Sequence, residues 1–357
     1  MSGRGLRRGA VAIVTASLTL GLMSLPAGAE PDLATARTQA KTLAVQVDKL
    51  EIRTEMATEN FNEINDQLQT VVNEMTVAEQ EVDAAKAGAK SQDDVAEGRV
   101  RALYMAGGSA ALYATVLDSG SIGDVLSRVD SVNSLVDSDR VEAQQSWTTV
   151  RTAEKARKKL GELALKRTRL QDQADNARTA VESLLAQRTR QLATATSTVR
   201  RLADEYTARK TRLAAESARV RLMDLGVLGD QPAGNPFATA AIAAARSKVG
   251  VPYVWGATGP NTFDCSGLTQ WSYRASGLNI NRTSRQQWYD GVKVELADLR
   301  PGDLLFWAYD LSKPATIHHV SMYIGAGRMI EAPRTGVDVR EVPIYLDGYI
   351  GAIRPGT

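Results

Sequence analysis

The chain has 357 residues, which is enough for two or three domains. Its 43 basic and 41 acidic residues are nearly balanced, so the charge gives no indication of nucleic-acid binding. The single cysteine excludes an intrachain disulfide bond.

Residues 1–29 have the pattern of a secretory signal. Arg4, Arg7 and Arg8 give a basic start, and residues 10–25 carry no charge. Residues 27–29 fit a small-x-small cleavage site. The apolar run is shorter than the ~20 residues of a membrane-spanning helix, which favours cleavage over an uncleaved anchor. We expect export by the Sec or the twin-arginine route, to a secreted, periplasmic or cell-wall-associated location.

Residues 33–85 keep a heptad repeat of apolar residues. Only Thr54 interrupts the apolar positions, and no proline or glycine occurs between residues 33 and 86. This pattern is typical of a coiled coil. At 1.5 Å of rise per residue, the predicted helical arm is about 80 Å long.

Glycines interrupt the repeat between residues 87 and 123, and an amphipathic helix follows. We expect a small helical tip near residues 87–136 that folds the chain back. A second apolar heptad pattern then runs from about residue 141 to 223 and predicts one long arm. Two arms that flank a tip favour an antiparallel hairpin, and a parallel dimer of extended chains is the alternative.

Residues 226–236 have the composition of a linker, with three glycines and two prolines. Of the 19 aromatic residues, 14 lie from Phe237 onward, so the last third can bury a compact core. The expected domains are a signal peptide (1–29), a coiled-coil regulatory or targeting region (30–225), the linker (226–236) and a catalytic domain (237–357).

The only cysteine, Cys265, is expected in the first turn of a short helix. Asp264 is a good N-cap, and Gly277 suits the residue after the helix end. A helix N-terminus and a nearby imidazolium lower the pKa of a thiol from about 8.5 to roughly 3.5–7.5. The alternative is a small buried core residue, since free cysteines are often buried.

Strands are predicted after these helices, at about residues 303–307, 319–325, 328–332, 337–342 and 349–353. Helices followed by strands indicate an α+β domain. The only two histidines, His318 and His319, are neighbours on one strand and point to opposite faces. We assign the role of base to His319, which shares the more polar face with Ser321. Glu331, on the next strand, is a candidate to orient the imidazole, and a surface glutamate is the alternative.

Five short segments occur together and in order within residues 237–357. They are Tyr253–Gly256, Phe263–Gly267, Arg282–Ser284, Arg300–Asp303 and His319–Gly325. In this combination the region resembles the NlpC-type cell-wall endopeptidases, a family of papain-like cysteine peptidases. The resemblance implies hydrolysis of peptidoglycan stem peptides, typically between D-γ-glutamate and meso-diaminopimelate.

The resemblance also implies roles for single residues. Cys265 corresponds to the nucleophile, His319 to the base and Glu331 to the third residue, a position that is most often His in the family. Tyr253 corresponds to a tyrosine of the oxyanion environment. The other residues expected to bind the oxyanion or the substrate are Asp264, Ser266, Arg282 and Ser284.

Segments of the helical region resemble the coiled-coil domains of wall hydrolases that the FtsEX complex controls, with actinobacterial RipC-like proteins as the nearest comparison. These segments are Arg101–Tyr104, Asp118–Ile122 and Leu126–Asp130. The resemblance implies a membrane partner at the division site. Leu103, Tyr104 and Leu126 are the candidate contact residues.

We therefore predict a long coiled-coil hairpin followed by a papain-like α+β cysteine peptidase domain. The predicted activity is that of a peptidoglycan endopeptidase, with the helical region restraining the enzyme until a partner binds. No metal or organic cofactor is expected, because one Cys and two adjacent His make no zinc set. The alternative is a non-enzymatic envelope scaffold that binds peptidoglycan without cutting it.

Overall fold

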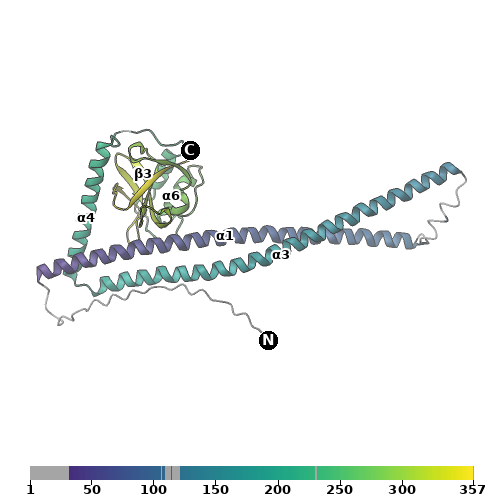
Figure 1. Cartoon of the computed structure of the whole chain (residues 1–357), viewed down its shortest axis with the longest axis horizontal. Helices are drawn as coiled ribbons and strands as arrows, with labels where there is room; N and C mark the ends of the chain where they lie inside the picture. The colour runs from purple at the N-terminus through teal and green to yellow at the C-terminus, as the bar shows by residue number, and fades with distance from the viewer. Residues whose placement is uncertain (1–31, 106, 109–113, 115–120, 230, 357) are drawn as a thin grey trace, which may run out of the picture.

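The computed structural model describes residues 32–105, 107–108, 114, 121–229 and 231–356. The predicted signal segment lies outside these residues. Figure 1 shows a long helical hairpin with a small α+β domain seated on one side of it, close to one end. The predicted architecture, a helical coiled coil followed by an α+β domain, is confirmed.

Two helices of 73 residues each form the hairpin: α1 (Leu33–Met105) and α3 (Ile122–Thr194). Ser121 caps the start of α3, because its side chain accepts a hydrogen bond from the amide of Asp124. Along the hairpin, Val71 and Ala78 of α1 pack with Leu163 and Leu170 of α3. The apolar heptad positions therefore lie between the two helices, as a coiled coil requires.

The helix α1 is longer than the sequence pattern suggested, because it continues through Gly88 and Gly98 to Met105. Each glycine costs about 1 kcal/mol relative to alanine in a helix. The surrounding residues are good helix formers, which offsets this cost. A Cβ at Gly88 would lie 3.7 Å from Thr149, so α3 packs closely against α1 at this glycine. Within the described residues, α1 ends at Met105 and α3 begins at Ile122, so both arms extend into the segment 87–136 that was predicted as the tip.

The second arm is not one continuous helix. It breaks at Ala195, whose backbone is extended, and Thr196 caps a new helix, α4 (Ser197–Asp224). Figure 1 shows α4 turning away from the hairpin and leading to the α+β domain. This break places the domain beside α1.

The α+β domain begins with α5 (Ala238–Arg246), α6 (Cys265–Ala275) and α7 (Ser284–Gln287). Its sheet contains β1 (Gly291–Val294), β2 (Leu304–Ala308), β3 (Ile317–Gly325), β4 (Arg328–Glu331), β5 (Arg340–Pro343) and β6 (Tyr349–Pro355). The strand order is β1-β6-β2-β3-β4-β5, and every neighbouring pair is antiparallel. The edge strand β1 was not predicted.

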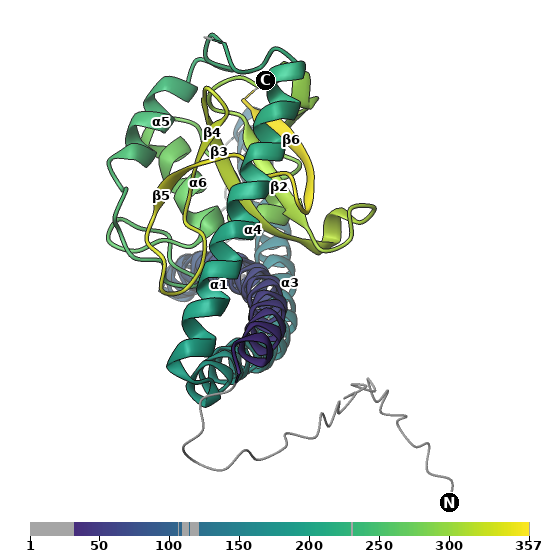
Figure 2. The same ribbon diagram turned by 90° about the vertical axis from the view of Figure 1, so that its left-hand side faces the viewer.

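Each face of the sheet buries its own apolar cluster. On one face, α5 and α6 pack against β2 and β3 through Leu268, Phe306 and Val320. On the other face, the end of α4 supplies Leu222, which packs against the sheet next to Tyr323. Figure 2 shows α4 and the pair α5–α6 on opposite sides of the sheet. Because α4 covers one face of the sheet, it is part of the domain's core as well as its tether.

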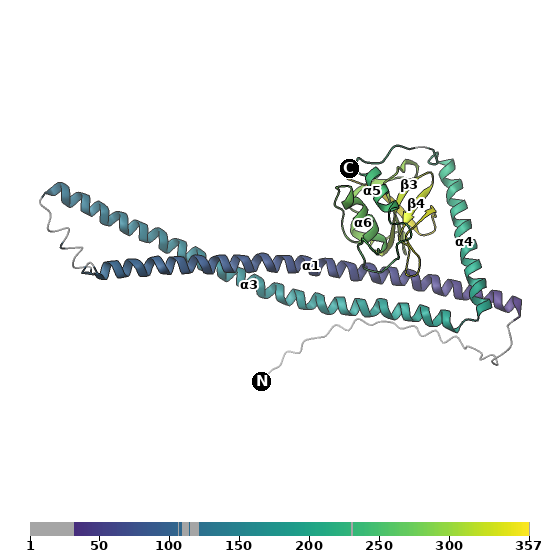
Figure 3. The same ribbon diagram turned by 180° about the vertical axis from the view of Figure 1, so that it is seen from behind.

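The helix α1 passes directly beneath the α+β domain, as Figure 3 shows from behind. Contacts between α1 and β3 are among the tertiary contacts of the chain. Over the described part of the chain, no helix has the length and apolarity to span a membrane.

Candidate active site

Cys265 is the first residue of α6 and lies in a fixed backbone setting. Asp264 caps the helix, because its Oδ1 accepts a hydrogen bond of 2.7 Å from the amide of Gly267. A side chain at Gly267 would not fit, since its Cβ would lie 2.1 Å from the carbonyl oxygen of Ala257. The predicted helix, its N-cap and the place of the thiol in the first turn all occur as expected.

The carboxylate of Asp264 is completely buried and is held by a guanidinium. Arg282 donates to its two oxygens at 3.1 and 2.6 Å, and also to the hydroxyl of Ser266 at 2.9 Å. The amide of Gly256 donates to Asp264 as well, at 3.0 Å. A buried carboxylate requires this set of donors to remain charged. The Asp264–Arg282 ion pair and the bond from Gly256 therefore connect the loop around Gly256 and the segment before α7 to the start of α6.

The second half of the site lies on β3 and β4. Nε2 of His319 is 3.0 Å from Oε2 of Glu331, and both side chains are buried. The pairing of β3 with β4 places these strands side by side, as the sequence predicted. Burial opposes charge on both groups, but their hydrogen bond raises the pKa of His319 and lowers the pKa of Glu331. In this hydrogen bond, Nε2–H donates to the carboxylate of Glu331.

The two halves of the site meet at the start of β3. The thiol of Cys265 lies 4.0 Å from the carbonyl oxygen of His318. Nδ1 of His319 is buried and has no hydrogen-bond partner among the described residues, so it is the nitrogen available for proton exchange. The imidazole of His318 instead contacts the hairpin, with Nδ1 2.7 Å from Oε2 of Glu55.

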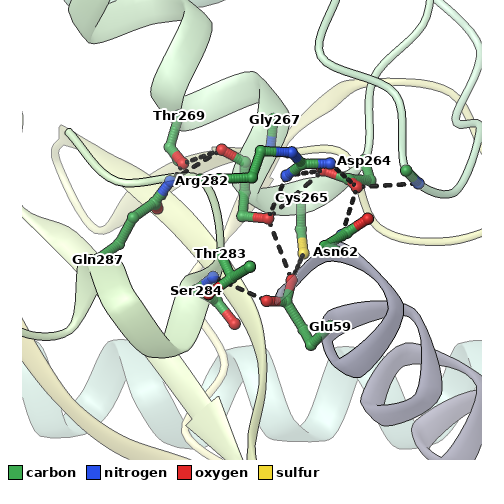
Figure 4. A network of polar contacts seen from close by, with 12 residues as sticks. Glu59, Asn62, Asp264, Cys265, Gly267, Thr269, Arg282, Thr283, Ser284 and Gln287 are labelled. Atoms are coloured by element: carbon green, nitrogen blue, oxygen red, sulfur yellow. Dashed lines mark hydrogen bonds and ion pairs between the residues drawn. The ribbon is translucent and has the colours of Figure 1, made fainter. Parts of the chain in front are cut away.

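A residue of α1 occupies the space in front of the thiol. Figure 4 shows Glu59 reaching from α1 toward Cys265 and Ser284. Its Oε1 lies 3.7 Å from Sγ and accepts a hydrogen bond of 3.1 Å from the hydroxyl of Ser266. Its Oε2 accepts a hydrogen bond of 2.9 Å from the amide of Ser284. Glu59 is only 1% exposed, so the thiol is covered.

Further contacts between α1 and the domain flank Glu59 on both sides. Asn62 donates to Asp264 at 3.0 Å, and the rings of Phe61 and Trp255 meet edge to face with their centroids 5.0 Å apart. Further polar pairs are Glu51–Arg334, Glu63–Arg285 and Asp66–Gln286. Arg285 also donates to the carbonyl oxygen of Met56 at 3.3 Å. The contact thus extends over about four turns of α1, and we call this arrangement the closed form.

The closed form changes the charge state expected of the thiol. Burial, together with the carboxylates of Glu59 and Asp264, raises the pKa of Cys265 well above its usual value. Burial and the nearby Asp264 also raise the pKa of Glu59 to about 7. The prediction of a lowered thiol pKa is therefore wrong for the closed form, because α1 excludes water and adds a carboxylate that the sequence argument did not include.

The other predicted site residues lie around Cys265 or on the hairpin. Tyr253 is buried close to the thiol, and this burial raises the pKa of its hydroxyl well above the usual value. The predicted substrate-binding residues Asp264, Ser266, Arg282 and Ser284 lie together in one polar network (Figure 4).

The three candidate partner-binding residues lie far along the hairpin. Tyr104 and Leu126 are 81% and 62% exposed. Leu103 belongs to α1, but its side chain lies outside the described residues. No contact tests their predicted role, which therefore stays a prediction.

Sequence reasoning missed the part of α1 that reaches the site. Residues 51, 55, 59 and 63 are all glutamate, so like charges recur every four residues on one helix face. Such pairs destabilise an isolated helix by a few tenths of a kcal/mol each, or roughly 1 kcal/mol for the three. The repeat indicates a surface that needs cationic or hydrogen-bonding partners, and the domain supplies them.

A cavity of about 1050 Å³ remains between α1, α4 and the domain on the other side of the two histidines. Its lining includes Glu55, Trp307, His318, His319 and Arg340. The closed form therefore covers the thiol side of the site more completely than the imidazole side. The described residues contain no cluster of three or more His, Cys, Asp or Glu that could hold a metal ion.

A cysteine at a helix N-terminus, beside two paired strands of which one carries a histidine and the next a glutamate bonded to it, is the arrangement of a papain-like thiol hydrolase. The family model described as "NlpC/P60 family" matches residues 250–351. The family model described as "Peptidoglycan hydrolase PcsB, coiled-coil domain" matches residues 82–146. Residues 250–351 therefore form an NlpC/P60 domain, and residues 82–146 belong to a PcsB-type coiled-coil domain.

Individual relatives agree with this assignment over the carboxy-terminal domain. A γ-D-glutamyl-L-lysine dipeptidyl-peptidase of Bacillus cereus is 42% identical over 116 residues, which are 32% of this chain and 34% of the relative. A Corynebacterium glutamicum protein named a probable endopeptidase is 37% identical over 141 residues, 40% of this chain and 64% of the relative. The solved NlpC/P60 domain of peptidoglycan hydrolase SagA is 33% identical, with a TM-score of 0.30. The match covers 32% of this chain and 97% of the solved domain. The chain thus spans less than two thirds of the curated relatives that it matches.

Proposed function

We propose that this protein is a secreted peptidoglycan endopeptidase that its own coiled coil holds in a closed form. One observation carries the proposal: the carboxylate of Glu59 fills the space in front of Cys265 in a domain of the NlpC/P60 family. A scaffold that only binds peptidoglycan would not need to cover a thiol placed at a helix N-terminus. A hydrolase acting on its own cell wall does need such restraint.

The proposed reaction uses three residues. Once α1 leaves, His319 takes the proton of Cys265 through Nδ1, and the thiolate sulfur attacks the carbonyl carbon of the stem peptide. Backbone amides at the start of α6, with Tyr253, stabilise the oxyanion. The imidazolium of His319 protonates the leaving amine, and the imidazole then activates the water that hydrolyses the thioester. Glu331 holds Nε2–H throughout.

We further propose a γ-D-glutamyl bond as the bond that is cleaved, typically the one to meso-diaminopimelate. The donors that bind Glu59, the hydroxyl of Ser266 and the amide of Ser284, form a site for a carboxylate. A γ-linked glutamate carries a free α-carboxylate close to its scissile amide. The names of two similar proteins, the γ-D-glutamyl-L-lysine dipeptidyl-peptidases of Bacillus cereus and Bacillus subtilis, support this choice.

The experiment compares the full chain with a released variant, Phe61→Ala/Asn62→Ala, in which two contacts of α1 with the domain are lost. The matched control is Val72→Ala/Asn73→Ala, which truncates an apolar residue and the asparagine after it where α1 is exposed to solvent. All three proteins are incubated with purified muropeptides, and the products are identified by mass spectrometry. Circular dichroism checks that the helical content is unchanged.

The released variant should cleave the peptides at least tenfold faster than the full chain or the control. Equal rates for all three would refute the restraint and leave the coiled coil as a targeting device. Adding Cys265→Ala to the released variant should abolish cleavage. Unchanged cleavage after that substitution would refute the cysteine mechanism, and intact peptides with every protein would favour the scaffold function.

We also propose that a division-site partner, an FtsEX-like membrane complex, opens the closed form through the far end of the hairpin. The match of residues 82–146 to the PcsB coiled-coil domain and the exposure of Tyr104 and Leu126 support this role. A partner that binds the open form better shifts the equilibrium by its differential affinity. The extracellular part of an FtsX-like protein should raise the rate of the full chain, and Tyr104→Ala or Leu126→Ala should block this rise.

A further inference from the structure

The carboxylate of Glu331 has more partners than a two-residue His–Glu pair requires. Its Oε2 lies 3.0 Å from Nε2 of His319 and accepts a second hydrogen bond, also of 3.0 Å, from the hydroxyl of Tyr345. Its Oε1 accepts hydrogen bonds from Nε and Nη2 of Arg340, at 3.0 and 2.8 Å. Each carboxylate oxygen is therefore used twice, and every partner acts as a donor.

The fold brings these donors together from separate segments. Glu331 on β4 and Arg340 on β5 are directly paired in the antiparallel register. Tyr345 follows β5, and its ring lies 4.9 Å from that of Trp307, centroid to centroid. The ring of Trp307 is in turn 5.5 Å from the imidazole of His319. Two of the three groups around Glu331, His319 and Tyr345, thus rest against one aromatic ring, which limits their movement.

Glu331 needs these donors because it is fully buried. Desolvation favours the neutral carboxylic acid, whereas the hydrogen bond and charge of His319, followed by those of Arg340, lower the pKa of Glu331. A neutral Glu331 would no longer pair with an imidazolium. It could also donate its own proton to Nε2, and that would leave the proton of a neutral imidazole on Nδ1, the nitrogen that must accept a proton from the thiol.

We propose that Arg340 and Tyr345 are positioning residues that keep Glu331 an ionised acceptor and so fix the tautomer of His319. The structure gives neither residue a contact with Cys265, and both act on the reaction through Glu331. Only the kinetic consequence of this inference rests on the proposed peptidase function. The charge state and tautomer of His319 can be measured without any substrate.

Other charged groups also face this cluster. Glu55 of α1 lies across the cavity and contributes to raising the pKa values of His319 and Tyr345. Burial keeps the pKa of the Tyr345 hydroxyl well above its usual value, so Tyr345 remains a donor at neutral pH. The measurement must therefore separate the effect of Arg340 from that of Glu55, which leaves the site when α1 opens.

The two histidines of the chain allow a direct test. Labelling with ¹⁵N-histidine yields ring-nitrogen signals from only two imidazoles, and the His318→Gln variant shows which of them belong to His319. Chemical shifts of the ring nitrogens report the tautomer and the titration of His319 in the full chain. The variants are Arg340→Gln, Arg340→Lys and Tyr345→Phe. The control is Arg328→Gln, which removes an exposed arginine of β4 that pairs with Glu341.

Removing the guanidinium takes away a cation that opposes protonation of the His319–Glu331 pair. Both apparent pKa values of the pair should therefore rise in Arg340→Gln, by about one pH unit. Tyr345→Phe should cause a smaller rise in the same direction, and Arg340→Lys should be close to wild type. The Nε2–H tautomer should lose population in Arg340→Gln and stay dominant in Arg328→Gln.

The kinetic readout uses the same substitutions in the released variant. The acid limb of kcat/KM should shift to higher pH by the same amount, and kcat at the optimum should fall about tenfold, as a one-unit change implies. KM should stay constant, because neither residue is expected to touch the substrate.

A purely structural role would lower the melting temperature without moving the tautomer or the pH profile, and that result would overturn the inference. A shift in Arg328→Gln as large as in Arg340→Gln would also overturn it. If the tautomer responds as expected but no variant of the chain cleaves muropeptides, the positioning role stands and the proposed peptidase function fails.

Discussion

Replacing Glu331 with glutamine tests the His319–Glu331 pair with a minimal change of shape. An amide can replace part of an orienting group, which by itself would predict only a partial loss of turnover. The structure predicts a larger loss. Arg340 donates to Oε1 from two nitrogens, so the amide oxygen of the glutamine must face Arg340.

This orientation of the amide determines which ring nitrogen of His319 carries the proton. The amide NH₂ then points toward Nε2 of His319, which must become an acceptor. The proton of the neutral ring moves to Nδ1, and His319 can no longer accept the proton of Cys265. The equivalent exchange of aspartate for asparagine in a serine peptidase lowers kcat about 10⁴-fold through the same wrong tautomer. We expect a loss of about 10³- to 10⁴-fold in kcat for Glu331→Gln.

The assay measures kcat and KM for muropeptide cleavage in the released variant, with and without Glu331→Gln. KM should change little. The matched control is Glu341→Gln on β5, whose carboxylate pairs with Arg246 at 2.9 Å and lies outside the site. A loss of less than tenfold in Glu331→Gln would refute the reasoning, because the amide would then have kept the productive tautomer.

Three further predictions concern the thiol, the histidines and pH. Cys265→Ala should abolish cleavage without changing the circular dichroism spectrum. In the released variant, His319→Ala should cost at least 100-fold more activity than His318→Ala; equal losses would show that the assignment of the base is wrong. The pKa of Glu59 is about 7 in the closed form and should return toward its usual 4.5 once α1 is released. Closure should therefore be fully favoured below about pH 4.5 and weaken as the pH rises through 7. Alkylation of Cys265 should accelerate over this pH range more in the full chain than in the Glu59→Gln variant. Glutamine at position 59 has no titratable group, so closure of that variant cannot depend on its protonation.

Local sequence was sufficient for most of the helices and strands and for the capped helix start that carries the thiol. The heptad repeat predicts α1 and α3, because the apolar period of a coiled coil is a property of neighbouring turns. Asp264 predicts the start of α6, since an N-cap acts within three residues. The alternation of β3 places His318 and His319 on opposite faces for the same local reason.

Other features depended on contacts between residues far apart in the chain. The heptad pattern continued across Ala195, so it gave no sign that α4 would turn away there. That turn places the domain over residues 51–66 of α1, and only then do four glutamates at intervals of four residues meet their partners. The predicted lowering of the pKa of Cys265 was wrong for the same reason. A helix N-terminus is a local effect, whereas the burial and the added carboxylate come from a segment about two hundred residues earlier.

The environment of Glu331 shows the same division. Its distance from His319 along the chain predicted that the two could pair across neighbouring strands. The register of β4 with β5 brings Arg340 next to the carboxylate of Glu331, and the loop after β5 brings Tyr345 there as a second donor. Strand periodicity specifies which face a side chain lies on, but the partner on the next strand depends on register, which tertiary packing sets.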